Sequence, residues 1–286
     1  MTNGLRPQEK AGVLAEALPY IRRFWSRVVV VKYGGSAMED PALAQLFAQD
    51  VVLMRSVGMR PVVVHGGGPQ IGDLMNRLGK EPEFREGLRV TDAETLDIAR
   101  MVLVGKVNRD IVSEVNVHGP LAVGLSGEDA GLITASRRSP DLGFVGDVEA
   151  VNASILERLL SEELIPVVAT IGSDLEGQAY NINADTAAGA IAEALSAEKL
   201  VYLTNVEGLL KDVADPGSVI SQLSADELEA MIDDGVLTEG MIPKARSCLR
   251  AVRRGVGHAH ILDGRVPHAL LLEIFTTEGI GTMVAP

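Results

Sequence analysis

Four consecutive valines constrain the fold of this chain more than any other segment. Val28–Val31 form a β-branched run without polar alternation, which is typical of a strand buried on both faces, as in parallel sheets. The run continues into Lys32, and Gly34 and Gly35 follow before a helical pattern begins. Ligands of open α/β sheets bind at the carboxyl ends of strands, and glycines let backbone N–H groups approach a phosphate. The segment therefore predicts a central strand with an anion-binding turn, although an ordinary strand-to-helix turn with a surface lysine shares this pattern.

A second segment repeats the same design. Pro61–Val64 is again rich in valine, and His65 precedes the three glycines of Gly66–Gly68. The residues between the two segments, 39–57, have the apolar periodicity of a helix. A strand, a helix and a second parallel strand form a βαβ unit, in which both glycine-rich turns lie at the same edge of the sheet. The repeat favours a ligand site at that edge.

Composition and charge disfavour several classes of function. The chain has 286 residues, a formal net charge of −13 and a single cysteine, Cys248. The negative charge argues against a nucleic-acid partner, and one cysteine allows neither an intramolecular disulfide nor a thiolate zinc site. No apolar run reaches the length of a membrane span, and the N-terminus lacks the apolar core of a signal peptide. We therefore expect a soluble cytoplasmic protein without a nucleic-acid or membrane partner.

The rest of the chain alternates helical and strand patterns. A helix with an apolar stripe is expected over residues 7–25, kinked at Pro19, and its stripe could pack on its own domain or on a partner subunit. The alternation predicts an α/β fold. Further strands are predicted at 121–125, 165–170, 199–204 and 258–262, antiparallel segments at 80–90, 132–137 and 144–151, and helices at 70–78, 92–118 with a break near Lys106, 152–162, 184–196, 225–233, 240–254 and 267–273.

Several common enzyme motifs are missing from the sequence. It contains neither G-x-x-x-x-G-K-[ST] nor G-x-G-x-x-G, so it has no P-loop and no dinucleotide fingerprint. It has no G-x-S-x-G motif, and none of its five histidines is paired at metal-ligand spacing on a helix. Hydrolase and metalloenzyme interpretations therefore have little support.

Two lysines lie where phosphoryl transfer would use them. Lys32 ends a buried strand, and Lys244 follows Pro243 at the start of a predicted helix. Phosphoryl transfer depends on positioning and on neutralising the charge of the transferred oxygens, and one cation at 4 Å contributes about 4 kcal/mol at an effective dielectric near 20. A carboxylate acceptor would already be ionised at neutral pH and would need no general base. The lack of a histidine constellation is compatible with such an acceptor.

The chain contains five segments whose order is informative: Val31–Gly35, His65–Pro69, Gly87–Thr91, Tyr180–Asp185 and Gly240–Lys244. Together they closely resemble the amino acid kinase family, and within it the branch whose acceptor is an acylated glutamate. The resemblance implies a three-layer αβα fold with a central, mainly parallel sheet and two lobes. It also implies three parts: a kinked oligomerisation and regulatory helix at 1–26, an acylglutamate-binding lobe at 27–197, and a nucleotide-binding lobe with a C-terminal effector segment at 198–286.

The resemblance further implies a reaction. The γ-phosphoryl group of ATP would pass to the side-chain carboxylate of N-acetyl-L-glutamate and give an acyl phosphate, a step of arginine biosynthesis. Mg²⁺ would arrive with the nucleotide, so no protein metal ligand is expected. Lys32 would stabilise the transferred group from the acceptor side, Lys244 from the nucleotide side, and Asp185 would keep both lysines in register by ion pairing. An aspartate at this position could also satisfy backbone donors at a helix N-terminus.

The remaining site residues are also implied by the resemblance. Gly67 and Gly68 would offer backbone N–H groups to the acylated amino acid and the phosphate, and Asn181 would bind near the lobe junction. Arg89 would bind the α-carboxylate, for which its planar guanidinium is suited, although without the motif it would read as a solvated hairpin arginine. The implied nucleotide-binding residues are Gly34, Gly35, Leu203, Thr204, Asn205, Gly208, Gly240 and Met241.

Both ends of the chain resemble the arginine-inhibited members of the family. Those relatives carry a kinked helix before the first strand, which interlaces dimers into a hexamer, a trimer of dimers, and they bind L-arginine beside that helix. Carried over to this chain, the implied effector residues are Tyr20, Lys199, His260, Glu273 and Gly279. Some photosynthetic relatives bind a PII-type signalling protein, and the sequence neither favours nor disfavours such a partner here.

Two alternatives stay open at the level of sequence. A kinase for the one-carbon-longer N-acetyl-aminoadipate, in lysine biosynthesis, would share nearly every motif. A catalytically silent arginine sensor would keep the fold and the effector site. Lys32, Asp185 and Lys244 are all present, which argues against the silent sensor.

Overall fold

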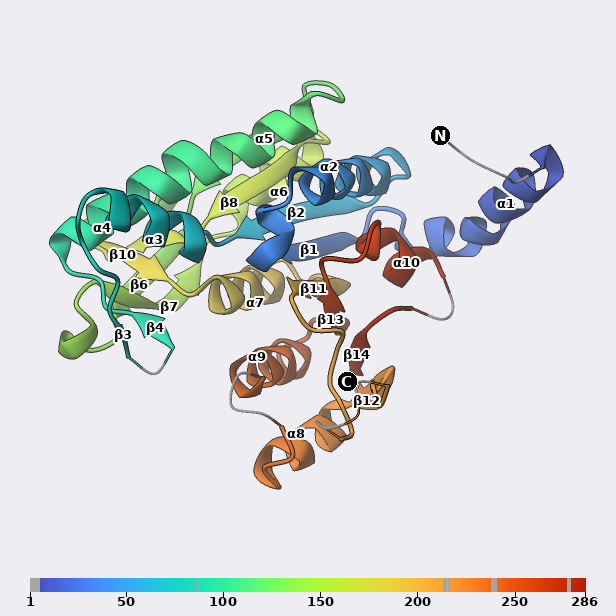
Figure 1. Cartoon of the computed structure of the whole chain (residues 1–286). Coiled ribbons are helices and arrows are strands. Elements are labelled where there is room, and N and C mark those ends of the chain that lie inside the picture. The colour runs from blue at the N-terminus through green and yellow to red at the C-terminus, as the bar shows by residue number, and fades with distance from the viewer. Residues whose placement is uncertain (1–5, 86, 213–214, 216, 238–240, 277–278) are drawn as a thin grey trace.

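An eight-stranded sheet runs through the whole molecule (Figure 1). The computed structural model describes residues 6–85, 87–212, 215, 217–237, 241–276 and 279–286. Neighbouring strands are parallel except for the β13–β14 pair, which is antiparallel. The predicted mainly parallel sheet is therefore confirmed. In spatial order the strands are β12 (Gln222–Ser224), β14 (Thr282–Ala285), β13 (His258–Asp263), β11 (Lys199–Thr204), β1 (Val28–Tyr33), β2 (Arg60–His65), β8 (Ile165–Ala169) and β5 (Ala122–Ser126).

Helices cover both faces of this sheet, which gives the predicted three layers. The valines of β1 alternate between the two resulting cores: Val29 and Val31 belong to one cluster and Val30 to the other, and all three are fully buried. The first face packs against α2 (Pro41–Ser56), α5 (Asn108–Asn116) and α10 (Ala269–Phe275). The second packs against α6 (Ser154–Ser161), α7 (Ala184–Ala194), α8 (Ala225–Asp233) and α9 (Ile242–Arg253).

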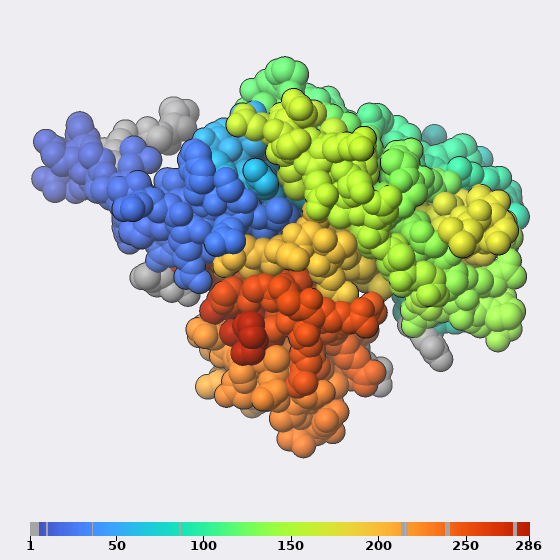
Figure 2. Space-filling view, turned by 180° about the vertical axis from the view of Figure 1, so that it is seen from behind, coloured from blue at the N-terminus to red at the C-terminus, as the bar shows by residue number. Residues whose placement is uncertain are grey.

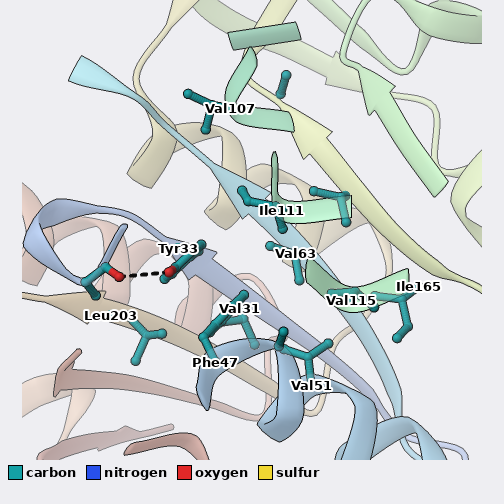
Figure 3. Close-up of a cluster of buried hydrophobic side chains, with 14 of the residues drawn as sticks. Val31, Tyr33, Phe47, Val51, Val63, Val107, Ile111, Val115, Ile165 and Leu203 are labelled. Atoms are coloured by element: carbon teal, nitrogen blue, oxygen red, sulfur yellow. Dashed lines mark hydrogen bonds between the residues drawn. The ribbon is translucent and has the colours of Figure 1, made fainter. Parts of the chain in front are cut away.

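Figure 3 shows the first of these cores where β1 meets α2 and α5. Val31 and Val63 from the sheet lie between Val51 of α2 and Ile111 of α5. The ring of Tyr33 stacks on Phe47 with 3.8 Å between centroids, and its hydroxyl donates to the Ala37 carbonyl at 2.9 Å. That hydrogen bond attaches the 3-10 helix Gly35–Met38 to the end of the central strand. The Tyr33 hydroxyl therefore holds the turn that follows β1 in place.

A small closed barrel lies beside the main sheet. It consists of β6 (Ile133–Arg137), β7 (Val145–Val151), β9 (Ile171–Ser173) and β10 (Ala179–Ile182). The antiparallel β6–β7 pair was expected, whereas β9 and β10 were not predicted as strands. Their close packing favours glycine at position 172, because a Cβ there would lie 2.6 Å from Ile182 Cδ1 and 3.0 Å from the carbonyl oxygen of Ile133. The predicted hairpin is also present, as β3 (Phe84–Arg85) and β4 (Leu88–Arg89).

The long helical region predicted after residue 92 contains an irregular turn. It divides into α4 (Ala93–Arg100), a π-helical segment (Met101–Val107) and α5. The expected break near Lys106 is therefore a change of helical register rather than an end. π-helical turns inside α-helices are frequent at functional sites. This one packs beside α3 (Gly68–Arg77), which begins at the second glycine-rich turn.

Helix α1 (Pro7–Phe24) projects away from the body of the molecule (Figures 1 and 2). Pro19 lies inside it and cannot donate the backbone hydrogen bond to the carbonyl of Ala15. Leu14 and Leu18 are 74% and 53% exposed, and Trp25 just after the helix is 61% exposed. Among the described residues, no helix combines the length and apolar character needed to cross a membrane.

Candidate active site

Three charged side chains meet at the carboxyl edge of the central strands. Lys32 Nζ lies 3.1 Å from Asp185 Oδ1, and Lys244 Nζ lies 3.3 Å from Asp185 Oδ2. Within the described residues, Oδ1 has no hydrogen bond of acceptable geometry, so Lys32 contacts it as an ion pair. Burial alone would raise the pKa of Asp185, but Lys32 and Lys244 outweigh it and the pKa lies below its ordinary value. The carboxylate is therefore ionised and bridges two cations.

Each of these residues is positioned by a different element. Lys32 is near the end of β1, Asp185 is in the first turn of α7, and Lys244 is in the first turn of α9. The N-terminus of α7 is capped by Asn183, whose side chain accepts from the N–H groups of Asp185 and Thr186. The alternative role considered for Asp185, satisfying backbone donors, is thus filled by Asn183. The Asp185 carboxylate is left for the two lysines.

A cavity of about 240 Å³ opens next to Lys32. Its polar lining includes Arg89 and Asn181, and Thr170 and Asn183 also border it. Both glycine-rich turns contribute backbone to its wall. The glycines that line it are Gly34, Gly35, Gly66, Gly67, Gly68 and Gly87. The structure thus brings Lys32, Arg89 and Asn181 to one cavity, together with Gly34, Gly35, Gly67 and Gly68.

Arg89 is nearly buried at the wall of this cavity. Its Nη2 donates to the Gly68 carbonyl at 2.8 Å, and its guanidinium lies over the ring of Phe84 at 4.8 Å. Burial lowers its pKa, although an arginine remains charged at any physiological pH. The group is not a solvated hairpin arginine. It is a fixed cation with donors left for an anionic ligand.

The other predicted nucleotide residues lie in the C-terminal part of the chain. Leu203 and Thr204 end β11, and the turn after them approaches the first glycine turn: a Cβ on Gly35 would lie 2.5 Å from Asn205 Oδ1. Met241 is the N-cap residue of α9, and Gly208 packs against Thr282. Gly240 lies outside the described residues.

The predicted effector residues form a second cluster, separate from the cavity. Lys199 Nζ donates to His260 Nε2 at 2.9 Å, and His260 Nδ1 in turn donates to Glu273 Oε1 at 2.6 Å. Burial lowers the pKa of Lys199 to about 8 and that of His260 to about 4. Lys199 also lies 5.1 Å from the ring centroid of Phe24, the last residue of α1.

The last two predicted effector residues border this cluster. Gly279 has a φ of +61° and lies against Glu273, so a side chain there would be strained and would contact the carboxylate. Tyr20 on α1 packs against the adjacent core. Phe24 was not predicted as part of the cluster, because its contact with Lys199 depends on how α1 meets the sheet.

Neither His65 nor Asn108 was assigned a role from the sequence, yet both are fully buried beneath the second glycine turn. The only available signal was the position of His65 immediately before three glycines. Among the described residues, no group of three His, Cys, Asp or Glu side chains could hold a metal ion.

Residues 27–263 match the amino acid kinase family. The chain belongs to the amino acid kinase family. Relatives named acetylglutamate kinase are similar over nearly their whole length. The one from Acidothermus cellulolyticus is 58% identical and covers 98% of this chain and 97% of the relative. The one from Saccharopolyspora erythraea is 56% identical, with 97% and 93% covered.

A solved structure of a protein named as a synthase shares the fold of this chain. N-acetylglutamate synthase from Neisseria gonorrhoeae, complexed with coenzyme A and N-acetyl-glutamate, has a TM-score of 0.85 and 28% identity, covering 96% of this chain and 63% of that chain. The same synthase complexed with coenzyme A and L-arginine has a TM-score of 0.79, 27% identity and coverage of 96% and 65%. This chain therefore spans less than two thirds of the synthase. The family membership confirms the resemblance inferred from the five segments.

Proposed function

We propose that this chain is a phosphotransferase that moves the γ-phosphoryl group of ATP to the side-chain carboxylate of N-acetyl-L-glutamate, the second step of arginine biosynthesis. The observation that carries the proposal is the Lys32–Asp185–Lys244 bridge beside a cavity lined by two glycine turns and Arg89. Relatives named acetylglutamate kinase, at 56% and 58% identity, support this acceptor. ATP use fits a cytoplasmic enzyme.

The acceptor fits the polar groups of the cavity. Arg89 pairs with the α-carboxylate, and Asn181 hydrogen-bonds the acetylamino group. The side-chain carboxylate then points toward Lys32 and the N–H groups of Gly67 and Gly68. Because this carboxylate is ionised at neutral pH, it attacks phosphorus without a general base.

Both lysines neutralise negative charge on the phosphoryl group while it is transferred. Lys32 faces the acceptor cavity, and Lys244 enters from the nucleotide side. As the bond to the leaving oxygen of ADP breaks and the bond to the carboxylate oxygen forms, each ammonium neutralises part of the charge on the phosphoryl oxygens. Asp185 keeps the two cations at a fixed separation. The cost of bringing two like charges together is met by the folded structure before substrates bind.

The nucleotide is bound as its Mg²⁺ complex, and the metal is part of that substrate. Gly34 and Gly35 face the transferred phosphate, and the turn after β11 with the start of α9 lines the remainder of the site. In this arrangement residues 27–197 bind the acylated amino acid and residues 198–286 bind ATP. The boundary coincides with the centre of the sheet, where β1 pairs with β11.

Steady-state kinetics with two acceptors test which acylated amino acid the protein phosphorylates. ADP release from MgATP should show a kcat/KM for N-acetyl-L-glutamate well above that for N-acetyl-L-2-aminoadipate, the one-carbon-longer alternative. A preference for aminoadipate would move the proposal to lysine biosynthesis. No ADP release with either acceptor would favour the silent sensor.

The proposal includes feedback inhibition by L-arginine. The Lys199–His260–Glu273 cluster lies against the last residue of α1, so a ligand there contacts the regulatory helix and the nucleotide-binding lobe at once. Glu273 suits a guanidinium or an α-amino group. A solved relative was crystallised with L-arginine, which supports this ligand class.

The proposal also includes a hexamer built as a trimer of dimers through α1. Val13, Leu14, Leu18 and Trp25 are each more than half exposed on or next to a helix that leaves the body of the molecule. Such a surface favours a partner helix. Sedimentation velocity should give a hexamer, and a Leu14→Glu/Leu18→Glu variant should give dimers. Wild-type protein that sediments only as a dimer and ignores arginine would remove both parts of this regulatory proposal.

A further inference from the structure

His65 has an unusual position directly beneath the second glycine turn. It is the last residue of β2, its side chain is fully buried, and it points into the same core as α5. Its Nδ1 lies 2.9 Å from the carbonyl oxygen of Gly66. Its Nε2 lies 3.0 Å from Nδ2 of Asn108. Both ring nitrogens therefore have a partner in the interior.

These partners determine which nitrogen carries the proton. The Gly66 carbonyl can only accept, so Nδ1 must donate. The Asn108 amide nitrogen also donates to the carbonyl of Val167 at 2.8 Å, which identifies it as the NH₂ group, so Nε2 must accept. Burial lowers the pKa of His65 to about 4, and the ring is neutral at pH 7. The ring is thus fixed as the Nδ1–H tautomer.

The hydrogen bond from His65 fixes the orientation of the Gly66–Gly67 peptide. In a trans peptide the carbonyl and the following N–H point in opposite directions. With the Gly66 carbonyl turned inward to His65, the Gly67 N–H points outward, and Gly67 lines the cavity. Within the part of the chain that the structure describes, the Gly67 N–H donates to no protein acceptor.

This peptide needs an external constraint because glycine lies on both sides of it. Two glycines allow the peptide plane to rotate at little steric cost. A rotated peptide would present the Gly66 carbonyl oxygen to the cavity, where it would repel a phosphoryl oxygen. On the inner side, a Cβ built on Gly67 would lie 2.7 Å from Leu103 Cδ2 and 3.2 Å from Val107 Cγ2 of the π-helical segment, and these apolar atoms form no hydrogen bond that would set the direction of the carbonyl. His65 supplies the directional contact.

We propose that His65, with its tautomer set by Asn108, is a positioning residue that aims the Gly67 N–H at the transferred phosphoryl group. The inference rests on the proposed function and adds a residue to it. His65 touches neither substrate. The π-helical segment before Asn108 brings this amide over the ring while Leu103 stays against Gly67. That double contact is a reason for the irregular turn at this point.

Two matched variants separate positioning from packing. In His65→Asn, the side-chain NH₂ falls near the place of Nδ1 and can still donate to Gly66. In His65→Gln, the amide falls near the place of Nε2 and can accept from Asn108, but the donor to Gly66 is lost. The Asn side chain leaves the larger void, so it should lower the melting temperature at least as much as Gln does.

The two variants should rank in opposite order for activity and for stability: His65→Asn should be the more active one although it is no more stable than His65→Gln. We expect kcat of His65→Gln to fall by about 10²-fold, the loss typical of one oxyanion donor, with the KM for ATP nearly unchanged. His65→Asn should keep kcat within about tenfold of wild type. Binding of MgADP with aluminium fluoride and N-acetyl-L-glutamate, a mimic of the planar phosphoryl group, should weaken in the Gln variant and persist in the Asn variant.

The outcomes are distinguishable. If the two variants have equal kcat, or if activity follows melting temperature, the positioning role is overturned while the wild-type activity still supports the proposed function. An inactive wild type overturns the proposed function itself. Should His65→Gln fail to fold, Asn108→Ala removes the amide that sets the tautomer. A kcat for that variant equal to wild type would contradict the inference, and a lower kcat with an unchanged KM for ATP would support it.

Discussion

Lys32 Nζ lies 3.1 Å from Asp185 Oδ1, so the cation at the end of the central strand is fixed to the first turn of α7. The ion pair is mostly buried, with 12% of the Lys32 side chain and 13% of the Asp185 side chain exposed. A lysine held in this way has little freedom to move. In the proposed reaction it provides a preorganised charge for the phosphoryl group, which is more effective than a flexible surface cation.

Replacing Lys32 with Ala should abolish most of the activity. One cation near the developing charge contributes about 4 kcal/mol, so kcat should fall by about three orders of magnitude. If L-arginine binds at the proposed effector cluster, its binding should persist, because Lys199, His260 and Glu273 lie apart from Lys32. Lys106→Ala is a matched control, since Lys106 is 65% exposed and pairs only with Asp110 among the described residues. Steady-state kinetics and arginine titration by calorimetry measure the two effects, and an active Lys32→Ala enzyme would mean that the catalytic centre is placed wrongly.

Asp185→Asn should lower both activity and stability. The change keeps the size of the side chain but leaves Lys32 and Lys244 facing each other without a countercharge. Breaking a buried ion pair from one side destabilises by roughly 3 kcal/mol, which urea unfolding at neutral pH can measure. The kcat should fall at least as far as in a Lys244→Ala variant, because both cations are misplaced. A variant with wild-type kcat would show that the lysines are positioned without Asp185.

Arg89→Lys should affect the acceptor and spare the nucleotide. A lysine keeps the charge but cannot reproduce the bidentate fork or the contact with Gly68. We expect the KM for N-acetyl-L-glutamate to rise by about tenfold or more while the KM for ATP stays near wild type. A rise in the KM for ATP alone would mean that Arg89 contacts the nucleotide and not the acceptor.

His65 should make the protein less stable in acid. Burial lowers its pKa in the folded protein to about 4 from an unfolded value of 6.5. Below pH 6.5 the unfolded chain therefore binds the proton first, so stability present at pH 7 is lost as the pH falls from 6.5 to 4, by up to about 3 kcal/mol.

The contribution of His65 is measured by comparing the pH dependence of the unfolding free energy between wild type and variants. Burial raises the pKa of Asp50 to about 6, although the His268 hydrogen bond opposes this, and a raised acid pKa gives the opposite slope between pH 4 and 6. His65→Asn should remove the His65 contribution and leave those of Asp50 and of His260, whose pKa burial also lowers to about 4, so the unfolding free energy of the variant should fall less steeply as the pH is lowered. His118→Gln, which changes an exposed histidine, should behave as wild type. Identical slopes for all three proteins would contradict a neutral His65.

The sequence was sufficient for the elements whose residues carry a strong local pattern. The valine run identified β1 to within a residue, and the strand 199–204 and the helix 225–233 have their predicted bounds. Strands β9 and β10 were missed because they are three and four residues long and contain glycine and asparagine, so neither offers a β-branched pattern. Their strand pairing is set by the closure of the barrel, in which β10 pairs with β7 and β9, and β9 also pairs with β6.

Only part of the candidate site could be predicted from the sequence, because some of its residues carry no local pattern. Lys32 and the glycine turns could be singled out from position alone, whereas Arg89 required the family resemblance. The His65–Asn108 contact joins the end of β2 to the start of α5 across a π-helical turn, and the amide reaches Val167 on a third element. A contact that depends on three elements and an irregular helical register leaves no periodic trace in the sequence.

The most direct test of the account is chemical trapping of its product. Wild-type protein incubated with MgATP, N-acetyl-L-glutamate and hydroxylamine should yield a hydroxamate, because an acyl phosphate forms at the side-chain carboxylate and is intercepted. Lys32→Ala should yield almost none, and L-arginine should diminish the wild-type signal. Wild-type enzyme that hydrolyses ATP without forming a hydroxamate would contradict phosphoryl transfer to a carboxylate, and with it the function proposed for this site.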